Sequence, residues 1–86
     1  DYVFKADYDL QSLSSVSDFI AKNGHLPNSP SAAEVAANGI ALGEMNAKLL
    51  EKIEELTLHT IHQETKLQSQ EELIKTLIKR IENLEN

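Results

Sequence analysis

The second half of the chain carries a heptad pattern of apolar residues. With Ile53 at position a, one register runs without a break from Leu42 to Leu84. The a positions are Asn46, Ile53, Thr60, Leu67, Ile74 and Ile81, and the d positions are Leu42, Leu49, Leu56, Gln63, Gln70, Leu77 and Leu84. Nine of these thirteen residues are Leu or Ile. Such a pattern over several heptads is typical of a coiled coil.

This pattern predicts one long helix over residues 42–86, with partners of its own kind. A helix of about 43 residues is roughly 65 Å long, and the residues before it are too few to cover the whole seam. Burial of each Leu or Ile contributes on the order of 1.5–3 kcal/mol. We therefore expect identical copies to bury the seam together.

Charged residues beside the seam favour a parallel arrangement. Lys66 at position g precedes Glu71 at position e by five residues, and Arg80 precedes Glu85 in the same way. Pairs with this spacing join neighbouring parallel helices in register.

The number of chains is predicted from the width of the apolar face. Ile at a with Leu at d favours a dimer. Leu73 at g and Ile78 at e widen the face, and a wider core would let the amides of Gln63 and Gln70 bond one another or hold a water or an ion. We expect a homotrimer, with a dimer as the alternative. The polar layers should fix the register at a cost in stability, and Asn46 should either do the same at the start of the coil or bond the N-terminal segment.

A second apolar stripe lies on the outer side of the first heptads. Leu50, Leu58 and Ile61 fall at e, f and b, which a bare coiled coil would leave in water. We expect residues 1–41 to dock on this stripe as a collar around the start of the coil.

Two short helices are predicted within the collar. Leu13, Val16, Phe19 and Ile20 share one helical face, which begins after Ser12 and ends at Gly24. Ser31 and Glu34 form a capping-box pattern that opens a second helix, which closes at Gly39. The first four residues, DYVF, are rich in β-formers and predict a short strand or an extended arm.

The segment Gly24–Ser31, GHLPNSPS, is predicted to be a connecting turn, or corner, between these helices. Pro27 and Pro30 hold it extended, and Leu26 is expected to anchor it to the core. His25 has no second ligand nearby in sequence, so we expect its ring to bond a backbone carbonyl or a helix end. Ser29 and Ser31 lack the strand-turn-helix context of a nucleophile.

His59 and His62 could share a metal with Glu55, because they are three residues apart on a helix. In the heptad register they point outward, so surface histidines are the preferred interpretation. No catalytic residue, cofactor or metal ligand is predicted.

Composition and charge exclude several other classes. The chain has 86 residues, a formal net charge of -6 and no cysteine. An acidic chain lacks the basic face that nucleic acid requires, and the longest apolar runs are too short to cross a membrane. Without thiols there is neither a disulfide framework nor a thiolate metal site. Because the chain opens on Asp1 without a targeting segment, we expect it to be a piece of a longer protein.

Residues 1 to about 61 resemble a C-terminal module of bacterial tail-fibre-domain proteins and of long surface or secreted proteins. The resemblance rests on the opening DYVF, on Asp7-Tyr8, on Gly24-His25-Leu26-Pro27 with Pro30-Ser31, and on the run LGEMNAKLLEKIEELTL. Ser14, Ser15 and Ser17 depart from it, because acidic residues are usual there. The larger self-cleaving chaperone of some tail-fibre proteins has an opening motif that is missing here.

The sequence and the resemblance together give a set of expectations. The fold is mainly α, with a collar over residues 1–41 and a coiled-coil helix over 42–86. The resemblance implies a non-enzymatic module that trimerises, registers and stabilises a longer fibrous, tail-fibre-like or adhesin-like protein. Its partners would be its own copies and the upstream domains, and its place extracellular, at a cell surface or on a phage-like particle. The alternative is an adhesive tip that binds a ligand through Tyr2, Phe4, Tyr8 and His25.

Overall fold

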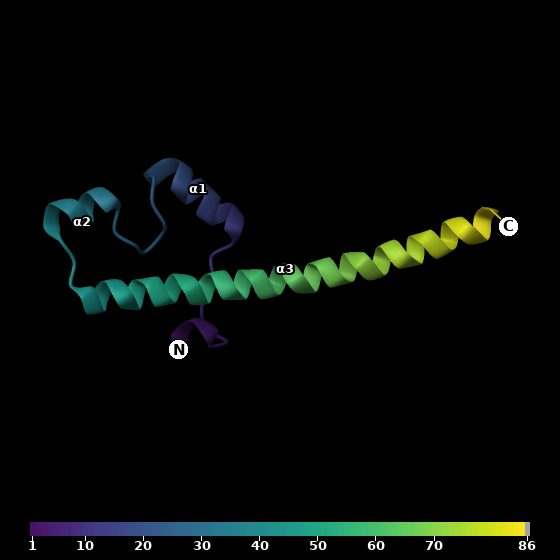
Figure 1. Ribbon diagram of the computed structural model, residues 1–86, viewed down its shortest axis with the longest axis horizontal. Coiled ribbons are helices and arrows are strands. Elements are labelled where there is room, and N and C mark those ends of the chain that lie inside the picture. Colours follow the sequence, from purple (N-terminus) through teal and green to yellow (C-terminus); the bar gives the residue numbers. More distant parts are fainter. Residues whose placement is uncertain (86) are drawn as a thin grey trace. The chain divides into compact units, whose positions relative to one another are not determined.

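The computed structural model describes residues 1–85, and those residues are mainly helical, with no strand among them. A 3-10 turn, η1 (Tyr2–Phe4), is followed by α1 (Leu13–Asn23), α2 (Ala32–Asn38) and α3 (Leu42–Glu85) (Figure 1). The predicted pair of short helices and the long C-terminal helix are confirmed. The chain divides into two compact units, Asp1–Leu56 and the part from Thr57 onward, so the first unit holds residues 1–41 together with the start of α3.

The long helix begins and ends close to the predicted limits. It contains no proline, and its one glycine, Gly43, lies in the first turn, where it interrupts little. Glu44 in that turn suits the positive end of the helix dipole.

Both short helices have the caps that the sequence predicts. The hydroxyl oxygen of Ser12 accepts a bond of 3.1 Å from the backbone N–H of Ser15, and Gly24 ends α1 in the left-handed region with φ 76°. The hydroxyl oxygen of Ser31 accepts from the N–H of Glu34 at 3.1 Å, and the N–H of Gly39 closes α2 on Val35. These bonds satisfy donors and acceptors that a helix end leaves free.

The strand predicted at the N-terminus is wrong. Tyr2–Phe4 form a 3-10 turn, in which the N–H of Phe4 donates to the carbonyl of Asp1 at 3.1 Å and that of Lys5 donates to Tyr2 at 3.2 Å. The described residues offer no strand to pair with, so the backbone groups bond locally instead. The turn directs Val3 inward, where it is 1% exposed.

The corner between α1 and α2 is anchored differently from the expectation. Leu26, the expected anchor, is 44% exposed. Asn28 takes that place, because its polar groups bond α3 and its backbone adopts φ 56°. Asn tolerates this left-handed conformation better than most residues.

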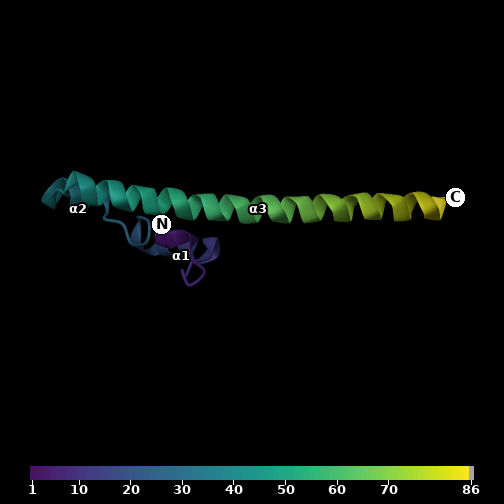
Figure 2. The same cartoon turned by 90° about the horizontal axis from the view of Figure 1, so that it is seen from below.

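Within the first unit, the N-terminal segment lies across the start of α3. Figure 1 draws η1 on the opposite side of the helix from α1, whereas Figure 2 draws both on the same side. The connection over residues 5–12 therefore crosses one side of α3. Tyr2 in η1 and Tyr8 in this connection both reach the surface of α3, where they bond glutamates.

Candidate functional site

The nine Leu and Ile residues at a and d positions are exposed in the single chain. Their exposed fractions run from 45% for Leu77 to 87% for Leu84. In the first unit these residues are Leu42, Leu49, Ile53 and Leu56, and in the second they are Leu67, Ile74, Leu77, Ile81 and Leu84. An apolar stripe that recurs at heptad spacing and remains in water is the surface a coiled coil buries.

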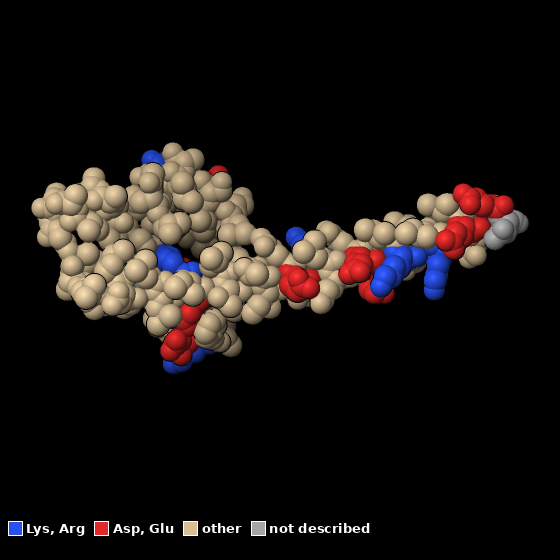
Figure 3. Space-filling model, in the orientation of Figure 1, with Lys and Arg blue, Asp and Glu red and all other residues tan. Residues whose placement is uncertain are grey.

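The second unit has no interior in a single chain. Every described residue from Ile61 to Glu85 is exposed. Acidic and basic side chains are interspersed along it (Figure 3). Most of the stability of a protein helix comes from the packing of an apolar face, and residues 61–85 have no such packing within the single chain.

The polar a and d residues lie in the same exposed face. Asn46, Thr60, Gln63 and Gln70 are all exposed. Their predicted role, together with the core role of the apolar a and d residues, remains a prediction about the assembled coil.

The collar is attached to α3 through carboxylates. The Tyr2 hydroxyl donates to Oε2 of Glu51, and the Tyr8 hydroxyl donates to Oε2 of Glu55 at 2.5 Å. The two tyrosine rings lie 5.8 Å apart at an angle of 49°, which is within the range for a favourable aromatic pair. Lys52 bridges the two carboxylates, at 3.3 Å from Glu51 and 2.9 Å from Glu55.

Asn28 ties the corner to the same place. Its side-chain N–H donates to Oε1 of Glu51 at 2.9 Å, and its backbone carbonyl accepts from Nζ of Lys48 at 3.3 Å. Glu51, 7% exposed, thus joins three separate stretches of sequence. We call Tyr2, Tyr8, Asn28, Glu51 and Glu55 the collar latch.

These bonds shift the ionisation of the latch. The hydrogen bond to Glu51 raises the pKa of Tyr2 from 10.0 to about 12, and burial and the neighbouring carboxylates act in the same direction. The hydrogen bond to Glu55 raises the pKa of Tyr8 well above its ordinary value. The bond from Tyr2 lowers the pKa of the Glu51 carboxyl, an effect that burial opposes and that Asn28 and Lys52 reinforce.

Glu54 is buried beside this latch, with one carboxylate oxygen lacking a hydrogen-bond partner. The residue is 6% exposed, and the oxygen without a partner is Oε2. A buried oxygen without a donor destabilises the folded state.

Sequence reasoning missed the collar latch. The residues on which the collar was expected to dock differ in their exposure. Leu50 and Ile61 are about half exposed, and Leu58 is partly buried. Their docking role remains a prediction. No sequence pattern predicts the collar latch, because Tyr2 and Glu51 lie 49 residues apart.

The candidate reactive residues sit in ordinary surroundings. Nδ1 of His25 lies 2.9 Å from the carbonyl of Leu26, as predicted, and its ring meets Phe19 edge-on at 5.4 Å. His62 is exposed and His59 partly buried. Among residues 1–85, no group of three or more His, Cys, Asp or Glu residues is placed to hold a metal, and no helix is long and apolar enough to cross a membrane.

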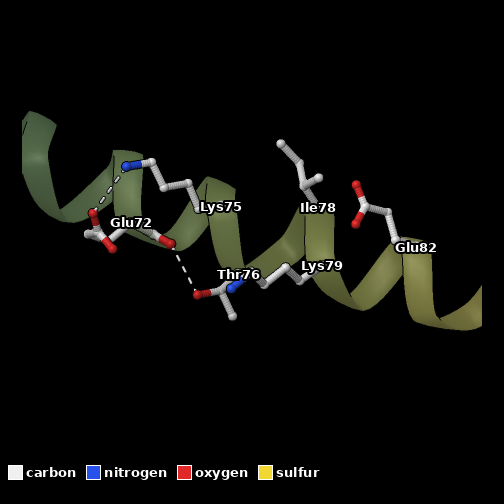
Figure 4. Close-up of a pocket in the computed structure, with 6 residues that line it drawn as sticks. All are labelled: Glu72, Lys75, Thr76, Ile78, Lys79 and Glu82. Carbon is white, nitrogen blue, oxygen red and sulfur yellow. Dashed lines mark hydrogen bonds and ion pairs between the residues drawn. The ribbon is translucent and has the colours of Figure 1, made fainter.

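A hollow in the second unit lies along a single helix. Its lining residues are Glu72, Lys75, Thr76, Ile78, Lys79 and Glu82 (Figure 4). Lys75 pairs with Glu72 at 3.5 Å, and the Thr76 hydroxyl donates to the Glu72 carbonyl at 3.1 Å. Most of these residues fall at b, c and f, so the hollow is on the side away from the seam, where a solvated face is expected.

No family model, curated protein or solved structure matches the chain. The resemblance to tail-fibre and surface-protein modules therefore rests on the quoted motifs alone.

Proposed function

We propose that this chain is a non-enzymatic oligomerisation and registration module, which assembles as a parallel homotrimer. The observation that carries the proposal is the exposure of all nine Leu and Ile residues at a and d positions. Their removal from water would supply the driving force for assembly. The charge spacing of Lys66 with Glu71 and of Arg80 with Glu85 favours parallel neighbours.

Three chains are favoured over two by the residues beside the seam. Leu73 at g and Ile78 at e are both about half exposed in the single chain. A two-stranded coil would leave much of that apolar surface in water, whereas a three-stranded coil covers more of e and g. Gln63 and Gln70 also fit a wider core, where their amides can bond across the axis.

The resemblance suggests which kind of protein would carry this module and where it would act. A module of this kind would hold the chains of a longer tail-fibre-like or surface protein in register, outside the cell or on a phage-like particle. The partners are then other copies of the chain and the upstream domains, with neither nucleic acid nor membrane insertion involved.

A second candidate is an adhesive tip. Tyr2 and Phe4 are each 54% exposed, and Tyr8 lies beside Tyr2, so the collar offers aromatic surface to a ligand. The tyrosine hydroxyls are already bonded to Glu51 and Glu55, which leaves the ring faces as the contact surface. Loss of ligand binding in Phe4→Ser, with the oligomer retained, would favour this role.

The assembly proposal is tested by charging the seam. Ile74→Lys places an ammonium group at an a position, and we expect loss of the oligomer and of most helical circular dichroism, because the seam can no longer exclude water. Thr76→Lys at an outward c position is the matched control and should retain both. Equal behaviour of the two variants would contradict the proposal.

A further inference from the structure

The collar has an apolar face that its own chain leaves half uncovered. Leu13 and Ile20 of α1 are 45% and 43% exposed, and Leu26 of the corner is 44% exposed. No residue of α1 or α2 is buried. An amphipathic helix is normally stabilised by burial of its apolar face, and the single chain covers the face of α1 only in part, since Val16 and Phe19 are partly buried.

A further half-exposed apolar residue of the same compact unit lies on α3. Leu50 at position e of α3 is 49% exposed, although the collar is latched to that helix. The positions of the latch residues on α3 explain why Leu50 stays exposed. Glu51 is at f and Glu55 at c, and Lys48, which bonds the corner, is also at c.

These positions place most of the collar toward the c and g flank of the helix, where Lys48, Lys52 and Glu55 are partly buried, although Glu54 at b is buried as well. Residues at c lie beside those at g, because they are separated by three or four residues on the helix surface. In a parallel coiled coil the g flank of one helix faces the e flank of the next. A collar latched at c and f therefore lies next to the e flank of the neighbouring helix, which carries Leu50 in this region.

We propose that the apolar face of α1, Leu13 and Ile20, packs on Leu50 of a neighbouring copy rather than on its own helix. This inference rests on the proposed parallel assembly and adds a second interface to it. Each collar is held to its own α3 by the polar latch and covers the adjacent copy with its apolar face. The collar thus locks neighbouring chains together outside the seam.

The test compares substitutions on the two faces of α1 in the full chain. Leu13→Ser with Ile20→Ser should raise the dissociation constant of the oligomer at least about tenfold, because apolar area buried between copies is lost. Ala21→Ser, at an exposed position of the same helix, should leave it unchanged. Sedimentation equilibrium gives both values. An unchanged constant in the double variant would overturn the inference.

Cross-linking separates contact between chains from contact within one. The chain has no cysteine, so Ile20→Cys and Leu50→Cys each introduce a single thiol. Co-refolded mixtures of the two variants should give a disulfide-linked heterodimer on oxidation. If the oligomer keeps its mass but the mixture gives no heterodimer, the inference is wrong and the assembly proposal stands. If the unsubstituted chain is monomeric, the assembly proposal itself has failed.

Discussion

Glu51 and Glu54 show how differently two buried carboxylates one helical turn apart act on stability. Glu51 accepts bonds from Tyr2 and Asn28 and pairs with Lys52. Glu54 is equally buried, but its Oε2 has no donor. Burial of a carboxylate is favourable only where hydrogen bonds replace those lost to water, so the first residue holds the collar and the second weakens it.

Substitution by Met, which keeps length and helix propensity, should separate the two effects. Glu51→Met should destabilise the protein by about 1–3 kcal/mol, because it removes the hydrogen bonds that the carboxylate accepts from Tyr2 and Asn28. Glu54→Met should stabilise it by about 1 kcal/mol, because it removes a buried oxygen that has no hydrogen-bond partner. Urea unfolding at one fixed protein concentration measures both. Shifts of the same sign would contradict this account of the latch.

The ionisation of the latch predicts a stability plateau with two edges. The folded pKa of Tyr2 is raised from 10.0 to about 12, so its contribution is full below pH 10 and is lost as pH rises through about 12. The folded pKa of Glu51 is lowered, so its contribution is present above its ordinary pKa of 4.5 and is lost as pH falls through the lowered value.

The alkaline edge can be measured directly, since Tyr2 and Tyr8 are the two tyrosines of the chain. The tyrosinate absorbance of the folded protein should rise well above pH 10, whereas the same chain in concentrated urea should titrate near 10. Coincident curves would show that neither hydroxyl is bonded in the folded state.

At the scale of the elements, the helix ends were predictable and the collar latch was not. Ser12, Gly24, Ser31 and Gly39 act on neighbours within a few residues, so sequence spacing alone placed them. The latch joins residues 23 to 49 positions apart, and Tyr and Glu carry no pattern that pairs them. The strand expected at DYVF failed for a related reason. Its β-forming residues favour a strand, but pairing needs a second strand, which the described residues lack.

Two of the glycines near helix ends, Gly24 and Gly43, lead to opposite predictions. Gly24 has φ 76°, where an added Cβ is strained, so Gly24→Ala should destabilise by about 1–2 kcal/mol. Gly43 lies within α3, where an added Cβ would meet no other atom within 4 Å, so Gly43→Ala should stabilise by about 0.5–1 kcal/mol. Thermal unfolding followed by circular dichroism ranks the three chains. A Gly24→Ala variant as stable as the parent would argue against the left-handed cap.

At the scale of the whole molecule, the proposed assembly would supply the apolar core that the single chain lacks. Among residues 1–85, the buried residues are Val3, Glu51 and Glu54, of which one is apolar. A single apolar side chain cannot offset the conformational entropy lost on folding. The stability of this protein should therefore depend on its concentration, as in obligate oligomers.

Gln63 and Gln70 at d positions are predicted to lower the stability of the coil while they fix its register. Replacement of both Gln63 and Gln70 by Leu should raise the unfolding free energy of the oligomer by about 1–4 kcal/mol, because apolar packing replaces buried amides. The same change should loosen register or chain number. Sedimentation velocity would reveal a mixture of species. If the variant forms a single species of unchanged size, residues other than Gln63 and Gln70 determine the register.

The most direct test of the central claim is the solution mass of the chain. Multi-angle light scattering over a roughly tenfold dilution series distinguishes an obligate oligomer from a monomer. We predict a mass about three times the 9.6 kDa of the chain, constant across the upper part of the series. A constant mass of one chain would contradict the account, since the exposed seam would then require a different protein to cover it.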